Sequence, residues 1–252
     1  MSSPSIDIII PNFNKGNFLE ECILSVINQS YSNWKLYIID DYSNDKSREI
    51  LNKYADNNKI NMLLLKKNKG PSFCRNLGIR ISTSEFIAFL DSDDYWSKDK
   101  LKNQINFMQK ENFQFTYTDY TSIFTKGKIN LFKKTKIKES FNFVEFTRNS
   151  SINSSTMILT RKIIKNHKFK KIELLEDYLF KCDILKNNII ARKLNNYSAY
   201  YRILPQNRSS SKVRNILWLW KINNQFNELT ILQNIRSVLG IVINSIKKYG
   251  FK

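Results

Sequence analysis

Three aspartates lie within four residues of one another, directly after a short apolar run. Asp91, Asp93 and Asp94 follow Phe86–Leu90. Carboxylates this close repel one another unless a cation or hydrogen-bond donors compensate their charge. A hard divalent ion such as Mn²⁺ or Mg²⁺ gives that compensation and keeps coordination sites for water and substrate phosphate. The alternative is a solvated acidic turn; an EF-hand is disfavoured because Trp96 stands where such a loop requires glycine.

Two further acidic pairs stand where one segment gives way to the next. Asp40 and Asp41 end the apolar run Lys35–Ile39, where a carboxylate can accept hydrogen bonds from a nucleobase or ribose, or cap a turn. Glu176 and Asp177 begin a helical pattern, where the helix macrodipole favours carboxylates whether or not they are catalytic. The sequence has no glycine-rich phosphate-binding motif of the dinucleotide or P-loop type. The phosphates of a bound nucleotide would therefore need a metal ion.

Histidine and cysteine contribute little to the expected chemistry. The single histidine, His167, lies in a basic stretch and is expected to be exposed rather than catalytic. Cys22, Cys74 and Cys182 are far apart and odd in number, which argues against a disulfide framework and fits a reducing compartment. None of these residues has the spacing of zinc ligands.

The elements that must position the acidic residues alternate between strands and helices in the first half of the chain. Strands are expected at Ile6–Ile10, Lys35–Ile39, Ile60–Leu65, Phe86–Leu90 and Phe113–Thr118, with amphipathic helices between them. Ser72 is the expected N-cap of the third helix. This alternation predicts an α/β fold with a mostly parallel sheet and helices on both faces. Since ligands bind beyond the carboxyl ends of such strands, Pro11-Asn12, Asp40-Asp41 and Asp91–Asp94 should gather at one edge.

The second half of the chain has a weaker pattern. We expect a basic loop or hairpin at Lys126–Lys138, strands at Thr156–Leu159, Ile189–Leu194 and Ala199–Ile203, a helix at Glu176–Lys186, a polar linker at Arg208–Lys212, and a helical tail from Asn215. The predicted organisation is a first half at 1–120, a second half at 121–212 and a helical extension at 213–252.

The tail carries an apolar stripe at helical spacing together with cations. The stripe consists of Ile231, Ile235, Val238, Val242 and Ile246, broadened by Leu232, Leu239 and Ile243; the cations are Arg236, Lys247, Lys248 and Lys252, and Trp218 and Trp220 precede them. A basic amphipathic helix of this kind can lie in a membrane interface. It can equally pack on the catalytic domain or on a second subunit of a homodimer.

The composition limits the classes of partner. The chain has 252 residues and a net charge of +19, from 41 Lys and Arg against 22 Asp and Glu. Such an excess favours an anionic membrane surface, a phosphorylated substrate or nucleic acid, although a Lys- and Asn-rich composition alone also produces it. No apolar stretch is long enough to span a membrane, and Met1–Asp7 does not resemble a signal peptide. We expect a cytoplasmic protein, with peripheral attachment to the inner face of the cytoplasmic membrane left open.

Five blocks of sequence resemble the N-terminal half of the family-two inverting glycosyltransferases of GT-A fold. They are Ile8–Lys15, Leu19–Tyr31, Ile38–Asp45, Asn68–Ile79 and Glu85–Trp96. The resemblance is specific because all five occur in order, with suitable spacing, between Ile6 and about Met108. It implies a Rossmann-like, mostly parallel sheet flanked by helices, followed here by a helical C-terminal extension. It also implies that the half at 1–120 binds the nucleotide sugar and that the half at 121–212 binds the acceptor and carries the catalytic base.

The resemblance also implies roles for residues of the donor site. Pro11 and Phe13 would flank the nucleobase, Asp41 would hydrogen-bond it, and Arg75 would line the nucleotide pocket. Asp91 and Asp93 match the family's D-x-D motif.

This motif holds the donor diphosphate through a divalent metal, Mn²⁺ or Mg²⁺. Asp93 would be the direct metal ligand, Asp91 would contribute to the same site and Asp94 would assist. Asp177 matches the aspartate that serves as the catalytic base, and Tyr200–Pro205 and Ser209–Ser211 resemble the segment that follows the base.

The implied activity is transfer of a sugar, with inversion, from a nucleoside-diphosphate sugar to a hydroxyl group. The donor is expected to be a UDP-sugar, and the acceptor a glycan or lipid-linked glycan in bacterial surface polysaccharide or lipopolysaccharide synthesis. Three rival hypotheses are a nucleotidyltransferase, a basic nucleic-acid-binding protein and an inactive scaffold. The absence of a nucleic-acid-binding motif and the intact aspartates argue against the last two.

Overall fold

The strand that begins the fold, β1 (Ile6–Asn12), is buried over nearly its whole length. It pairs in parallel with β2 (Trp34–Asp40) on one side and β4 (Phe86–Phe89) on the other. β3 (Ile60–Leu64) pairs in parallel with β2. Runs of β-branched and aromatic residues are typical of strands covered on both faces. The computed structural model describes residues 3–126, 129–204 and 211–249.

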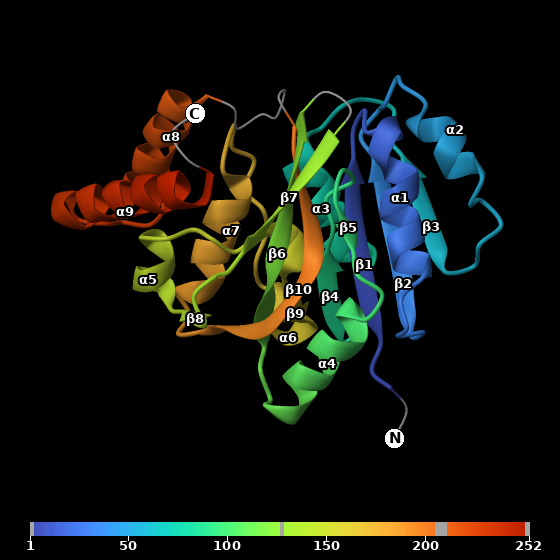
Figure 1. Cartoon of the computed structure of the whole chain (residues 1–252), viewed down its shortest axis with the longest axis horizontal. Helices are drawn as coiled ribbons and strands as arrows, with labels where there is room; N and C mark the ends of the chain where they lie inside the picture. Colours follow the sequence, from blue (N-terminus) through green and yellow to red (C-terminus); the bar gives the residue numbers. More distant parts are fainter. Residues whose placement is uncertain (1–2, 127–128, 205–210, 250–252) are drawn as a thin grey trace.

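The sheet continues from β4 into the second half of the chain. Its order is β3-β2-β1-β4-β9-β6-β10-β5, with β7 paired to β6 and β8 paired to β10. The remaining strands are β5 (Tyr95–Trp96), β6 (Phe115–Lys126), β7 (Ile129–Thr135), β8 (Ser140–Phe141), β9 (Ile158–Thr160) and β10 (Ala191–Ile203). β9 is antiparallel to both β4 and β6, and β10 is parallel to β6, so β6 and β10 run in the direction of the first four strands. The expectation of a mostly parallel sheet flanked by helices is confirmed (Figure 1).

Helices cover the sheet and connect its strands. They are α1 (Gly16–Ile27), α2 (Ser47–Asn52), α3 (Pro71–Ile81), α4 (Lys100–Lys110), α5 (Phe143–Thr147), α6 (Arg161–Ile164), α7 (Glu176–Leu185), α8 (Lys212–Gln225) and α9 (Ile231–Tyr249). The chain steps from β1 to β2 to β3 and then returns to β4 beside β1, so right-handed crossovers place α3 on the face opposite α1 and α2. α3 lies close to β1, because a Cβ at Gly78 would come within 2.5 Å of the Ile9 side chain.

The start of α3 differs from the expectation. Ser72 is not its N-cap: Gly70 holds that position with a φ of 86°, and Pro71 follows at the first helical position. Glycine adopts such a conformation without steric cost, and proline is pre-organised for a first turn whose N–H groups lack helical partners. The Ser72 hydroxyl instead donates to the main-chain oxygen of Lys170.

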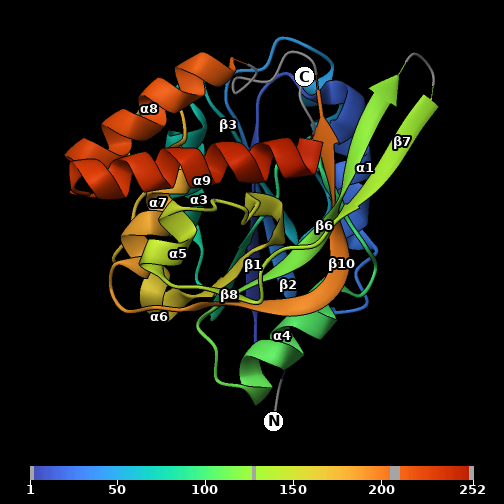
Figure 2. The same cartoon turned by 60° about the vertical axis from the view of Figure 1, so that its left-hand side comes forward.

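Two expectations for the second half also need correction. The segments Ile189–Leu194 and Ala199–Ile203 belong to one strand, β10, because shifts of its pairing with β6 between Leu194 and Ala199 absorb the irregular residues. The expected helical tail is present and consists of two helices, α8 and α9, which pack on each other on one side of the molecule (Figures 1 and 2). His167 is not exposed, since its ring is only 12% accessible and contacts the Asp183 carboxylate at 2.7 Å.

The other expected elements are present, although β6 extends to Lys126, so the basic hairpin is formed by the second half of β6 and by β7. The expected linker Arg208–Lys212 ends earlier than predicted, because Ser211 is the N-cap of α8 and Lys212 is its first residue. The rest of that linker, with two residues of Ser209–Ser211, Pro205 of Tyr200–Pro205, and Lys252, lies outside the described residues. None of the helices within the described ranges is long and apolar enough to cross a membrane.

Candidate active site

The carboxyl ends of β1 and β2 meet as the strand register requires. Asn12 pairs with Asp40 across the two strands, and its amide nitrogen donates to the Asp40 carboxylate at 2.8 Å. The second Asp40 oxygen accepts from the Ser43 N–H and from Arg48. Asp40 is fully buried and therefore serves as a structural anchor for this edge of the sheet.

Asp41, the next residue, organises the loop before α3. Its two carboxylate oxygens accept hydrogen bonds from the N–H groups of Lys69 and Gly70, at 2.6 and 2.7 Å. Each carboxylate oxygen has two lone-pair sites, so acceptor capacity remains for a ligand. The family resemblance implied that Asp41 hydrogen-bonds a nucleobase; in the structure its carboxylate holds the loop before α3.

Pro11 and Phe13 flank the same strand end. Phe13 is 46% exposed although it is a large apolar side chain, whereas Pro11 is half-buried. Two nearby residues, Asn14 and Tyr42, have positive φ angles of 52° and 67°. Such backbone conformations cost free energy and tend to occur where a loop is shaped for function. The arrangement leaves an aromatic ring available at this edge of the sheet.

The three aspartates after β4 do not share a single cation. Asp93 forms an ion pair with Lys15, with 2.7 Å between Oδ2 and Nζ. Asp91 forms one with Arg75, also at 2.7 Å. Asp94 is fully buried and accepts from the Ser155 hydroxyl at 2.6 Å. Protein cations and donors thus relieve the repulsion that the sequence predicted.

Asp94 is separated from the other two by its burial. Burial raises the pKa of Asp94 well above its usual value, and the charges of Asp93 and Asp91 raise it further. The N–H of Arg202 also donates to Asp94 at 3.0 Å. The expected assistance of Asp94 at a metal is therefore not supported by its orientation, which is toward the protein interior.

Arg75 connects the two halves of the candidate site. Its guanidinium contacts Asp91 at 2.7 Å and Glu176 of α7 at 3.4 Å, and it lies over the Phe169 ring. The carboxylates of Asp91 and Glu176 outweigh the opposing effect of burial and raise the pKa of Arg75. Arg75 was expected to line the nucleotide pocket; in the structure it is a buried bridge beside the D-x-D aspartates.

Asp177 follows Glu176 on the first turn of α7. Its Oδ2 lies 2.7 Å from Nζ of Lys181, one helical turn later, and that ammonium also donates to the Ile152 main-chain oxygen at 2.7 Å. Burial acts to raise the pKa of Asp177, but Lys181 and then Arg75 outweigh it, and the pKa is lowered. Asp177 is therefore ionised near neutral pH and able to accept a proton.

The residue before this helix is strained. Leu175, the N-cap of α7, has a φ of 62°, in the left-handed region that a leucine rarely adopts. The chain thereby turns sharply so that Glu176 faces Arg75 while Asp177 lines a pocket. Strain of this kind is held in place by the surrounding packing.

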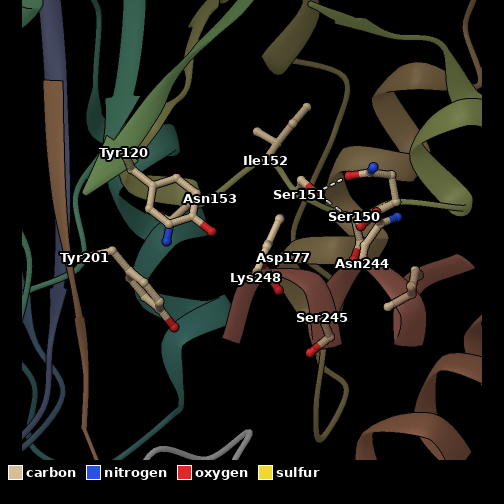
Figure 3. A pocket seen from close by; sticks show the side chains of 12 residues that line it. Tyr120, Ser150, Ser151, Ile152, Asn153, Asp177, Tyr201, Asn244, Ser245 and Lys248 are labelled. Atoms are coloured by element: carbon tan, nitrogen blue, oxygen red, sulfur yellow. Dashed lines mark hydrogen bonds between the residues drawn. The ribbon is translucent and has the colours of Figure 1, made fainter. Parts of the chain in front are cut away.

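That pocket has a volume of about 240 Å³. Its walls come from the segment 149–153, from Tyr120 of β6 and Tyr201 of β10, and from α9, as Figure 3 shows. Asparagine and serine side chains provide most of its polar groups. None of the residues predicted to bind the donor lines this pocket. Asp177 therefore faces a pocket that is separate from the predicted donor site.

Sequence reasoning missed several residues of the site. Lys15 lies just beyond β1, at the same sheet edge as Asp93, and that placement was a usable signal. Lys181 stands four residues after Asp177, the spacing of a helical ion pair. Arg202, which donates to the Asp93 main-chain oxygen at 2.5 Å, lies more than a hundred residues away. It belongs to Tyr200–Pro205, a segment that the family resemblance singled out without giving Arg202 a role. The sequence likewise gave no indication that α9 lines the pocket of Asp177.

The aspartates nevertheless suit a divalent ion. The side chains of Asp91 and Asp93 are 30% and 16% accessible to solvent. The Lys15 ammonium contacts Asp93, so a positive charge already lies beside that carboxylate. Within the described ranges, no cluster of three or more His, Cys, Asp or Glu side chains is arranged to hold a metal. Mg²⁺ and similar ions are commonly bound by one or two carboxylates together with substrate phosphates. The residues therefore fit an ion that arrives with a diphosphate.

The family profile and the related sequences that match this chain all belong to glycosyltransferases. The profile of the family described as Glycosyl transferase family 2 matches residues 7–169. A Haemophilus influenzae protein described as an uncharacterized glycosyltransferase is 32% identical over 99% of both chains. Escherichia coli WfgD, described as a UDP-Glc:alpha-D-GlcNAc-diphosphoundecaprenol beta-1,3-glucosyltransferase, is 32% identical over 98% of this chain and 95% of its own.

Solved structures share the fold at lower sequence identity. Staphylococcus aureus TarS 1–349 in complex with UDP-GlcNAc matches with a TM-score of 0.72 and 19% identity, covering 96% of this chain and 73% of that chain. The mannosyltransferase PcManGT of Pyrobaculum calidifontis, in complex with GDP-Man and Mn²⁺, has a TM-score of 0.70 and 12% identity, over 99% and 72% of the two chains. The expected GT-A architecture is confirmed.

Proposed function

Because the chain belongs to glycosyl transferase family 2, we propose that it transfers a sugar from a nucleoside-diphosphate sugar to a glycan hydroxyl in the synthesis of a bacterial surface polysaccharide. The observation that carries this proposal is the bridge formed by Arg75. It contacts Asp91 of the D-x-D motif and Glu176, the neighbour of Asp177. A donor held at Asp91 and Asp93 would thus lie close to the base that activates the acceptor.

The donor is a UDP-sugar in this proposal. WfgD takes UDP-Glc according to its description, and TarS was solved with UDP-GlcNAc. Phe13 offers an exposed ring against which the nucleobase stacks, Pro11 lies on the same strand end, and Asp41 has lone pairs left for a base N–H. PcManGT was solved with GDP-Man, so a GDP-sugar is the second candidate.

Asp93, with Asp91, would hold Mn²⁺ or Mg²⁺ together with the donor diphosphate. When bound, such an ion stabilises the negative charge that develops on the leaving nucleoside diphosphate. Lys15 contacts Asp93 at 2.7 Å and would have to release that carboxylate, which places its ammonium near the phosphates. The protein would then contribute both ligands and a cation to the leaving group.

Transfer proceeds by one displacement with inversion. Asp177 accepts the proton of the acceptor hydroxyl while the acceptor oxygen attacks the anomeric carbon. The bond between that carbon and the diphosphate oxygen breaks, and its electron pair leaves with the diphosphate. Lys181 and Arg75 keep Asp177 ionised for this task, as its lowered pKa indicates.

The acceptor is a glycan linked to a lipid diphosphate. The description of WfgD, of which this chain covers 95%, gives such an acceptor. The pocket beside Asp177 has room for a sugar ring and is lined by amide and hydroxyl groups that can pair with sugar hydroxyls.

A lipid-linked acceptor lies at a membrane, and the surface of α8 and α9 suits one. α9 buries Asn234 and Ser237 and packs Val238 and Ile241 against the core, while three other apolar side chains, those of Leu232, Leu239 and Ile243, are more than half exposed. Further exposed apolar side chains lie on α8, including Val213 and Leu217, and the cations Lys212, Arg214, Lys221, Arg236 and Lys247 are exposed on the same two helices. We assign this surface, the apolar face of α8 and α9, to an anionic membrane rather than to a second subunit.

Thermal denaturation with a panel of nucleotide sugars tests the donor assignment, because a ligand that binds only the folded state raises apparent stability. UDP-glucose, UDP-GlcNAc and GDP-mannose are compared with and without Mn²⁺. We expect a UDP-sugar to raise the melting temperature only when Mn²⁺ is present. Release of free UDP during transfer would distinguish glycosyl transfer from nucleotidyl transfer, which releases pyrophosphate. A protein that responds to none of these donors would contradict the proposal.

A further inference from the structure

We propose that Lys248 of α9 binds the phosphate next to the acceptor sugar, so that the C-terminal helix forms a diphosphate subsite opposite the catalytic base. The inference rests on the proposed function and extends it to acceptor recognition. Its first support is position: Lys248 and Asp177 line the same pocket of about 240 Å³ (Figure 3).

The face that α9 turns to the pocket has helical periodicity. Ile241, Asn244, Ser245 and Lys248 are spaced i, i+3, i+4 and i+7, and all four line the pocket. This stripe is distinct from the exposed apolar face of the same helix. One helix therefore separates two surfaces: a polar wall of the pocket and an apolar face that we assign to lipid.

The position of α9 is fixed by contacts one turn before the pocket. A Cβ at Gly240 would come within 2.4 Å of the Arg148 main-chain oxygen, so the helix lies directly on that backbone. The Ser237 hydroxyl donates to the main-chain oxygen of Thr147, and Asn223 of α8 donates to the Ser237 hydroxyl at 2.8 Å. Buried polar contacts of this kind define the register of a helix, so the pocket wall has a definite geometry.

The charge of Lys248 is not paired with a carboxylate in the described part of the chain, although Asp177 lines the same pocket. Burial lowers the pKa of Lys248 to about 8, and no carboxylate contributes to that shift. Among the described ion pairs none includes Lys248, whereas Asp177 is already paired with Lys181. A half-buried ammonium without a carboxylate partner carries a desolvation cost that an anionic ligand would offset. The Lys133 ammonium of β7 donates to the Lys248 main-chain oxygen, which holds this end of α9 in place.

The anion expected here belongs to the acceptor rather than to the donor. The donor diphosphate is assigned to Asp91 and Asp93, which do not line this pocket. An acceptor sugar with its hydroxyl at Asp177 must direct its other end toward the rest of the pocket. A diphosphate linked to a lipid would pass Lys248 on its way to the apolar face of α8 and α9.

Binding of three probes that share an octyl tail tests the subsite. Octyl diphosphate, octyl phosphate and octyl glucoside are titrated into the full chain, with UDP and Mn²⁺ present in excess so that the donor site is filled. We expect octyl diphosphate to bind wild type at least tenfold more tightly than octyl glucoside, because the tail is the same and only the head group differs. Lys248→Met should remove that advantage, and Lys248→Arg should keep most of it.

Lys102→Met provides the control, since Lys102 is exposed on α4 and belongs neither to the pocket nor to the surface assigned to the membrane. It should leave the affinity for octyl diphosphate within twofold of wild type. UDP binding and the melting temperature of each variant are measured in parallel, so loss of the donor site or of the fold is recognised separately. The inference is overturned if octyl diphosphate binds wild type no better than octyl glucoside, if both lysine variants weaken it equally, or if inorganic pyrophosphate binds as tightly as the octyl compound.

Discussion

At the scale of single residues, charge compensation dominates the site. Asp93, Asp91 and Asp177 each contact a protein cation, namely Lys15, Arg75 and Lys181 respectively. An ionised group held by an opposite charge is kept ionised and oriented until a ligand competes for it. The ion pairs are therefore consistent with binding of a cation at Asp91 and Asp93 and with acceptance of a hydroxyl proton at Asp177.

Asp93→Asn should abolish metal-dependent binding of UDP while the fold survives. The residue lies at the sheet edge, its side chain is partly accessible, and asparagine keeps its shape but not its charge. UDP affinity is measured with and without Mn²⁺ by calorimetry, with Asp56→Asn, an exposed aspartate, as the control. Equal, metal-independent affinity in wild type and Asp93→Asn would remove the D-x-D assignment.

Asp177→Asn should leave UDP binding intact and lower the rate of sugar transfer by roughly two to four orders of magnitude, the usual span for loss of a general base. The control is Asp183→Asn, since Asp183 lies on the same helix but pairs with His167 away from Arg75. Transfer is followed as release of UDP. A near-normal rate in Asp177→Asn would mean that the base lies elsewhere, with Glu176 as the next candidate.

At the scale of elements, α4 shows how a helix is attached through a buried charge. Lys100, at its first position, points inward, where its ammonium donates to Gln104 at 2.7 Å and lies over the Trp96 ring. Gln104 in turn donates to the main-chain oxygen of Thr156 at 3.1 Å, so the pair ties α4 to the segment before β9. Burial lowers the pKa of Lys100 to about 7 from its usual value of 10.5.

This shift predicts a pH dependence of stability. Between about pH 7 and 10 the unfolded chain keeps a proton on Lys100 that the folded chain has lost, so the contribution of Lys100 to stability increases with pH in this window. The free energy of unfolding of wild type, minus that of Lys100→Met, should rise from pH 7 to pH 10. Urea unfolding of both proteins at several pH values measures this difference in the free energy of unfolding. Titration of the other groups cancels because both proteins contain them. A difference that stays constant would show that the folded protein keeps Lys100 charged.

At the scale of the whole molecule, α9 borders both the pocket of Asp177 and the exposed apolar face of α8 and α9. α9 closes the pocket of Asp177 with one face and exposes apolar side chains on another, while both helices carry exposed cations. Burial of the apolar face would supply most of the free energy of membrane binding, and each cation near an anionic surface adds about 1 kcal/mol. Attachment at this face would leave the pocket close to the lipid phosphates.

Binding to anionic vesicles should therefore exceed binding to neutral vesicles and should weaken with salt, because screening shortens the reach of the charges. Replacing Leu232, Leu239 and Ile243 by serine should release the protein from vesicles without lowering its melting temperature, since all three side chains are exposed. Sedimentation with vesicles of stated lipid composition gives the measurement. If the triple variant instead converts a dimer into a monomer and vesicle binding is unchanged, the face belongs to a second subunit.

The sequence by itself determined the alternating strands and helices of the first half and the helical character of the tail. The isoleucine-rich β1, the aspartates after β4 and the helix beginning at Glu176 could all be predicted, because hydrophobic periodicity and strand-end residues are local signals. The meeting of Asn12, Asp40 and Asp91 at one edge followed from parallel pairing alone.

Only the tertiary structure decided which partner each charged residue has. Arg75 contacts Asp91 and also Glu176, which lies 101 residues further along the chain. Arg202 of β10 contacts the Asp93 backbone. Such pairs depend on how distant segments pack, and a sequence pattern gives no distance between them. The same limit applies to α9, because its apolar stripe left open whether the helix packs on the protein or lies at a membrane. In the structure Asn234 and Ser237 are buried and Val238 packs against the core, while most of the stripe stays exposed. Close approach of Gly240 to the Arg148 backbone places this side of the helix against the protein.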